Sequence, residues 1–304
     1  MTTFALTSRA DLTSTANTAL NTAARFWFFT AVAGQWIFAF YIAVVYASTA
    51  ARGDWTAWNK HGLAAGNTLG NAALVAHLLL AATITLSGAL QLIPAVRARF
   101  PLFHRWNGRI YVLSAFVMGI TGLSLVWAKR TFAGAGLQYV AVSINAILIL
   151  ICAAMALRTA MVRDFKTHRR WALRLFLAVG GVWFFRVGLM FWLFINKGPV
   201  GFNPKTFDGP FITALTFAQY LLPLAVLEIY MHAQERSNAI GRFATAGLLF
   251  VLTIVMAIGI FVATMGMWLP RIKTAEVAPH PPASQTLMTP PLHSIALIVT
   301  GEAV

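Results

Sequence analysis

The sequence has few charged residues and a single cysteine, and both shortages narrow the class of protein. Only 10% of its 304 residues are charged, 59% are hydrophobic, and the mean hydropathy is +0.73. A soluble globular domain carries about a quarter charged residues. A water-soluble fold is therefore excluded. Cys152 has no second cysteine with which to form an intramolecular disulfide, and we expect it to be a small buried residue.

Several catalytic and binding signatures are also missing. The sequence has no P-loop, no dinucleotide-binding glycine pattern and no nucleophile elbow. No close pair of histidines or carboxylates is joined by a third and fourth metal ligand. These absences predict no structural metal site and no common soluble enzyme chemistry.

What the sequence has instead is a series of apolar stretches long enough to cross a bilayer, which needs about 20 residues. We interpret them as helices, because a lone strand would leave its backbone groups unpaired in lipid. They run from Phe26 to Ala51, Gly62 to Val96, Ile110 to Ala128, Thr131 to Leu157, Trp171 to Asn196, Gly209 to Leu227 and Phe243 to Pro270. The prediction is an all-α, polytopic transmembrane bundle of about seven spans over residues 26–270. We expect a flexible inner N-terminal arm at 1–25 and a Pro-rich outer tail at 271–304.

The distribution of basic residues predicts which side each loop occupies. The net charge is +15, and with the amino terminus inside, 14 Lys and Arg residues fall on the inner side and 8 on the outer side. This asymmetry follows the positive-inside rule and indicates a cytoplasmic N-terminus. It also indicates membrane lipids, and no nucleic acid, as the partner of the basic residues.

An internal repeat marks the start of two apolar segments. "FHRWNGRIYVL" at 103–113 is nearly repeated by "THRRWALRLFL" at 167–177, which sets His104 and His168 64 residues apart. Each copy follows a basic inner loop, so we expect two parallel helical hairpins related by a pseudo-twofold axis along the membrane normal. Together these hairpins would form a four-helix core.

The repeat also supplies candidate binding residues. Its five arginines are Arg105, Arg109, Arg169, Arg170 and Arg174. They either anchor helix ends beside Trp106 and Trp171 at headgroup depth, or bind an anion such as a haem propionate, a lipid phosphate or a soluble phosphate. His104 and His168 would lie at equal depth, which a bis-histidine b-type haem requires. Structural or proton-relay histidines are the alternative.

Two further ionisable residues lie inside predicted spans, where function is the default hypothesis. His77 shares a helical face with Ala81, Ile84, Gly88 and Gln91, a narrow strip that suits close helix packing with a hydrogen-bonded histidine, haem ligation or quinone contact. Arg186 has no Asp or Glu at its depth. We predict a polar cavity that contains Arg186, His77 and some of the amides Gln35, Gln138, Asn145 and Gln219.

Glu228 and His232 are four residues apart and share one helix face. They are interpreted as partners of inner-loop arginines, with a proton path as the alternative.

These motifs together resemble a known family. The intramembrane His77, "LFHRWNGRIY", "THRRWALRLF", "FFRVG" and "LAVLEIY" are similar to the bacterial family of predicted membrane proteins called domain of unknown function 2306. The resemblance implies a bacterial inner (plasma) membrane location and brings no established activity. The alternating hairpins also look like those of transmembrane b-type cytochromes, although a strict repeat would place a partner for His77 at Ala141.

The leading functional hypothesis is binding of haem b or quinone in membrane redox chemistry, together with a redox partner. In the haem version the iron would be held by His104, His168 or His77. The alternatives are a non-redox transporter or lipid-handling protein with an intramembrane anion site and a small hydrophobic or anionic ligand, or an accessory membrane subunit.

Overall fold

The computed structural model describes residues 2–51, 68–129 and 136–277, and these ranges are helical with no strand. The helices are α1 (Thr2–Ala51), α3 (Thr68–Leu92), α4 (Pro94–Arg99), α5 (Pro101–Lys129), α6 (Gly136–Met161), α7 (Phe165–Val179), α8 (Gly181–Asn196), α9 (Pro210–Arg236) and α10 (Ala239–Ala263). A π-helical turn, η1 (Thr264–Trp268), joins α10 to α11 (Leu269–Val277). The all-α prediction is confirmed.

Long apolar helices account for most of the predicted spans. In the described residues, segments 11–45, 136–161, 210–236 and 239–273 are each long and apolar enough to cross a membrane, and α7 with α8 adds a fifth span bent by 52°. The described part of α3 adds a shorter apolar helix, Leu79–Leu92. α5 contains the predicted span 110–128. The chain is therefore a multi-pass membrane protein, and the count of seven spans stays a prediction.

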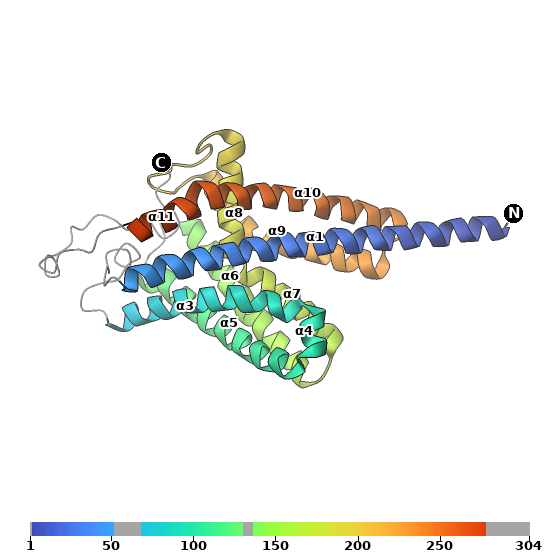
Figure 1. Cartoon of the computed structure of the whole chain (residues 1–304), viewed down its shortest axis with the longest axis horizontal. Coiled ribbons are helices and arrows are strands. Elements are labelled where there is room, and N and C mark those ends of the chain that lie inside the picture. Colours follow the sequence, from blue (N-terminus) through green and yellow to red (C-terminus); the bar gives the residue numbers. More distant parts are fainter. Residues whose placement is uncertain (1, 52–67, 130–135, 278–304) are drawn as a thin grey trace, which may run out of the picture.

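The two predicted hairpins pack into one four-helix core. Ile84 of α3, Tyr111 of α5, Cys152 of α6 and Leu175 of α7 belong to a single buried cluster. Cys152 is buried there, as expected. α1 and α10 lie side by side along much of their length (Figure 1), with α1 packed against α3 of this core and α10 packed against α8. Large side chains on outward faces, such as Phe29, Phe40 and Phe261, stay more than 60% exposed, as a lipid-facing surface requires.

Residues 2–25, which we expected to form a flexible arm, lie in α1, which is continuous from Thr2 for 50 residues. That length corresponds to about 75 Å at 1.5 Å per residue, which exceeds a bilayer core of about 30 Å. Figure 1 shows the N-terminal end of α1 projecting beyond the other helices. Leu20 and Ala23 are buried against the α9 and α10 residues Ala233, Ala246 and Leu249, and Ala16, one turn before Leu20, is buried as well; these three residues form a stripe along α1. The stripe was missed because two of its three buried residues are alanines.

The expected tail is also partly helical. Residues 271–277, the start of the predicted Pro-rich tail, belong to α11. Pro270 directly follows the π-helical turn η1, and the helical path runs on from α10 through η1 into α11 past this proline. The rest of the predicted tail, 278–304, lies outside the described residues.

The connections α3–α5, α6–α7 and α9–α10 lie at one end of the bundle, which we call the basic end because Arg97, Arg99 and Arg163 lie there. The opposite end carries the α8–α9 loop, 197–209, in which Asn203 N–H donates to the Asp208 carbonyl at 2.8 Å.

Candidate functional site

The repeated motif forms the same contact twice at the basic end. The Arg109 guanidinium lies over the Trp106 ring at 4.8 Å, and the Arg174 guanidinium lies over the Trp171 ring at 4.8 Å. Each pair is three residues apart on its helix, so the rings and guanidinium groups share a face. This cation–π contact accounts for two of the five arginines as helix-end anchors. Arg105 donates to its own helix, from Nε to the Pro101 carbonyl at 3.3 Å.

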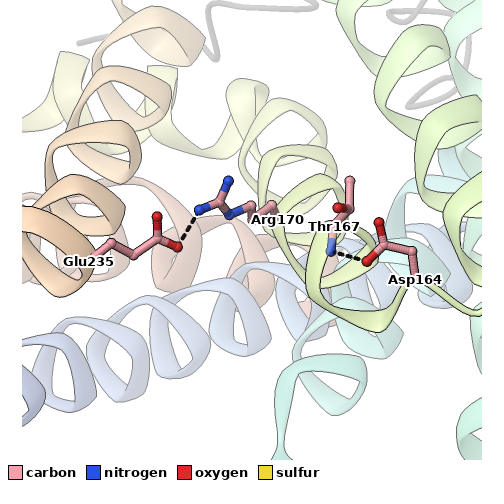
Figure 2. A network of polar contacts seen from close by, with 4 residues as sticks. All are labelled: Asp164, Thr167, Arg170 and Glu235. Atoms are coloured by element: carbon pink, nitrogen blue, oxygen red, sulfur yellow. Dashed lines mark hydrogen bonds and ion pairs between the residues drawn. The ribbon is translucent and has the colours of Figure 1, made fainter.

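Two ion pairs join α7 to α9. Figure 2 shows Arg170 of α7 reaching Glu235 of α9. One turn further, Arg174 Nε donates to Glu228 Oε1 at 2.7 Å. The structure thus pairs Glu228 with an arginine of the repeat, which is the ordinary interpretation of its position. These contacts fix the two helices against each other near the basic end.

α7 begins at Asp164, which caps its first turn. Asp164 Oδ1 accepts a hydrogen bond from the Thr167 N–H at 3.1 Å (Figure 2). Hydrogen bonds from Thr167 hold the pKa of Asp164 below its usual value, so the carboxylate stays charged at neutral pH. A negative charge at a helix start is favourable because it meets unpaired backbone N–H groups. The cap orients the arginines that follow it.

The two histidines of the repeat lie near each other, but they are bonded differently. His168 Nδ1 lies 2.8 Å from the Ala156 carbonyl of α6 and so donates to it. His104 Nδ1 is buried without a hydrogen-bond partner among the described residues. Burial lowers the pKa of His104, with further contributions from Arg97 and His168. The predicted proximity is supported, whereas ligation of a haem is not tested by these contacts.

His77 is bonded to the neighbouring helix. Its Nδ1 lies 2.9 Å from Thr121 Oγ1 on α5, and its ring packs beside Gly122, where an added Cβ would lie at an ordinary contact distance of 3.6 Å from His77 Cε1. Further along α3, a Cβ on Gly88 would lie 2.8 Å from the Tyr111 ring. The strip that begins at His77 therefore serves close packing of α3 on α5, and the flat ring that lies on it is the chain's own Tyr111.

The polar groups predicted to share a cavity with Arg186 lie at several places. Arg186 Nη1 donates to the Val182 carbonyl at 3.3 Å, and its guanidinium lies 5.1 Å from the centre of the Phe38 ring. Gln138 Nε2 donates to the Phe207 carbonyl in the α8–α9 loop at 3.2 Å. His77 is bonded on α5, as described above.

The other three amides meet at the bend between α7 and α8. A Cβ on Gly181 would lie 2.9 Å from Asn145 Nδ2 and 3.7 Å from Gln219 Oε1, and a Cβ on Gly180 would lie 3.4 Å from Gln35 Nε2. Gln35 Oε1 and Asn145 Oδ1 are buried without a hydrogen-bond partner among the described residues. Because Gly180 and Gly181 have no side chains, α1, α6 and α9 can each place a carboxamide against the bend between α7 and α8.

Sequence reasoning missed an apolar groove between α1, α7 and α9, which we call the α7–α9 groove. It encloses about 150 Å³. Its lining is apolar, with Trp27, Leu173, Phe176 and Val226 among the side chains, except for Arg169 and Tyr230 near the basic end. Pro223 also lines it, within α9. No short sequence signal could reveal it, because the lining comes from helices far apart in the chain.

A second cavity lies beside the two ion pairs. It encloses about 160 Å³ and is lined by Arg170, Glu228, Met231, His232, Glu235 and Arg236. This places His232 beside the ion pairs, as its spacing from Glu228 predicts. Neither of these two cavities is lined by His77, His104 or His168. In the described residues, no group of three or more His, Cys, Asp or Glu could hold a metal ion.

Comparison with known families agrees with the motifs. Residues 74–222 match the family model described as a predicted membrane protein, domain of unknown function 2306. The resemblance noted from the sequence is thereby confirmed over α3 to α9, the region that contains His77, both repeat motifs and Arg186. No curated protein and no solved structure matches the chain.

Proposed function

We propose that this membrane protein handles lipids by binding one amphiphilic molecule in the α7–α9 groove. The observation that carries the proposal is the groove itself, an apolar cavity whose single charged lining residue, Arg169, lies toward the basic end. An amphiphile has the same division into an apolar body and a polar end. Binding of this kind is one of the non-redox alternatives that the sequence leaves open.

The size of the groove favours a ring or part of a chain over a haem. An apolar cavity of about 150 Å³ holds a benzene-sized molecule, whereas sites for larger ligands enclose about 300–1,000 Å³. The haem predicted from the sequence would be held by His77, His104 or His168, and none of these histidines lines this cavity. The groove therefore supports a lipid chain or a quinone ring better than it supports haem b.

Quinone binding in membrane redox chemistry is the second candidate. It is favoured by Tyr230, whose hydroxyl accepts a hydrogen bond from Gln234 Nε2 at 2.7 Å and keeps its own hydrogen to donate. Such a donor at the end of an apolar groove suits a quinone carbonyl. A redox partner would then be required to reduce or oxidise the bound ring.

A substitution that fills the groove tests the proposal. Val226 is half-buried in the groove lining on α9, and Leu221 is 49% exposed on the same helix. We expect protein purified in mild detergent to carry about one lipid or quinone per chain by solvent extraction and mass spectrometry. Val226→Trp should lose most of it, while Leu221→Trp should keep it, because position 221 lies on the side of α9 opposite the groove-lining residues.

Three results separate the candidates. A bound amphiphile that survives Val226→Trp would overturn the groove as the site. A bound quinone, bleached in the ultraviolet by dithionite, would favour the redox candidate over lipid handling. A Soret band that weakens in His104→Ala or His168→Ala would support haem binding and would contradict the preference stated here.

A further inference from the structure

The arginines at the start of α7 differ in whether a carboxylate neutralises them. Arg170 pairs with Glu235, and Arg174 pairs with Glu228. Among the described residues no carboxylate forms an ion pair with Arg169. At the edge of the lipid, an arginine without a carboxylate partner in the protein is energetically less favourable than an arginine in an ion pair. Because no carboxylate neutralises it, the Arg169 guanidinium attracts an anion from outside the protein more strongly than Arg170 or Arg174 does.

Arg169 also continues the apolar face of α7 that lines the groove. Residues 169, 173 and 176 follow one another at helical spacing, so the cation ends a stripe made by Leu173 and Phe176. Tyr230 of α9 lines the same groove and can donate its hydroxyl hydrogen. The guanidinium offers five N–H donors in a fork that matches the oxygens of a phosphate. One cation and one hydroxyl donor therefore meet at the polar end of an apolar groove.

We propose that the occupant of the groove is an anionic phospholipid, with its phosphate on Arg169 and Tyr230 and part of an acyl chain along Leu173 and Phe176. This inference rests on the proposed function, and it adds the chemical class of the headgroup. It also agrees with the excess of basic residues at this end of the bundle, because such residues face the leaflet that carries anionic lipid. A zwitterionic headgroup such as phosphatidylcholine also carries an ammonium cation, which offsets the attraction of its phosphate for the guanidinium.

The test compares two lipids and three variants. Purified protein is stripped of lipid, and the affinity for phosphatidylglycerol and for phosphatidylcholine is measured by native mass spectrometry. Arg169→Gln should weaken phosphatidylglycerol binding by about tenfold, since a charged hydrogen bond to phosphate is lost. Phosphatidylcholine should lose much less, because its choline cation already neutralises the phosphate and repels the guanidinium. Arg105→Gln removes one charge from the same end but lies outside the groove, and it should change neither affinity by more than about twofold.

The outcomes separate this inference from the proposed function. If Val226→Trp abolishes lipid binding while Arg169→Gln has no effect, the groove is a binding site and the anionic headgroup is overturned. Equal losses in Arg169→Gln and Arg105→Gln would mean general attraction to charged lipid, which also overturns it. If Val226→Trp leaves both lipids bound, the proposed function fails together with this inference. Gel filtration of each variant checks that the protein is still assembled.

Discussion

Arg169, Arg170 and Arg174 show what residue-level reasoning can and cannot separate. The sequence indicates that these arginines lie at a helix start and that Glu228 meets an inner-loop arginine, and the structure supplies that partner as Arg174. The sequence cannot tell which of these arginines has a carboxylate partner, because that depends on the positions of the neighbouring helices. The helical period turns Arg169 toward the groove and Arg170 toward Glu235. The difference between Arg169 and the two paired arginines, on which the proposed headgroup site depends, is therefore set by helix packing.

The hydrogen bond between His77 and Thr121 gives a prediction at the same scale. The Thr121 hydroxyl donates to the Val117 carbonyl at 2.7 Å, so its oxygen must accept from His77 Nδ1. Thr121→Val removes that acceptor and leaves a polar N–H between α3 and α5. We expect a loss of about 1 kcal/mol in the free energy of unfolding, which is typical for hydrogen bonds between membrane helices.

The measurement is unfolding in mixed micelles, with Ser124→Ala as the control. Ser124 lies on the same helix, and its hydroxyl donates only to its own backbone at Ile120. Its removal should cost less than the loss of the acceptor on Thr121. Equal costs for the two substitutions would show that the contact with His77 contributes nothing to stability.

Small residues set how closely the helices of this bundle approach. Gly259 of α10 lies against α8, where an added Cβ would come within 2.5 Å of the Val187 carbonyl oxygen. Backbone cannot rotate away as a flexible side chain can, so α8 and α10 would have to separate. Sequence reasoning recognised such packing for the strip that begins at His77. It missed the alanine stripe of α1, because alanines add little to an apolar pattern yet allow close contact.

We therefore predict that alanine substitutions at two glycines of α10 change the stability of the protein in opposite directions. Gly259→Ala should destabilise the protein by about 1–3 kcal/mol, because the new methyl group overlaps the backbone of α8. Gly247 has nothing within 4 Å of an added Cβ. Gly247→Ala should stabilise the protein by about 0.5–1 kcal/mol, since alanine favours the helix. Unfolding in mixed micelles measures both, and a neutral Gly259→Ala would contradict the close approach of α8 to α10.

At the scale of the whole molecule, the sequence predicted the fold class and the four-helix core better than it predicted any site. Apolar length and the repeat around His104 and His168 are signals along the chain, so they can be read without the fold. The α7–α9 groove and the amides at Gly180 and Gly181 depend on helices that are distant in sequence. The N-terminal half of α1 depends on α9 and α10 in the same way.

The orientation of the bundle in the membrane gives the last prediction. The two repeat motifs follow the loops α3–α5 and α6–α7, and a parallel repeat places both loops on one side of the membrane. The positive-inside rule predicts that this side is cytoplasmic. Single cysteines at Phe100 and Val162, which are 61% and 68% exposed, and at Lys205 in the opposite loop can be placed in a Cys152→Ala background. An impermeant thiol reagent should label position 205 in intact cells, and positions 100 and 162 only after the membrane is opened.

Two other outcomes are informative. Labelling of positions 100 and 162 from different sides of the membrane would contradict the parallel repeat. Labelling of both positions from outside would keep the repeat but invert the protein in the membrane, which would place Arg169 in the outer leaflet.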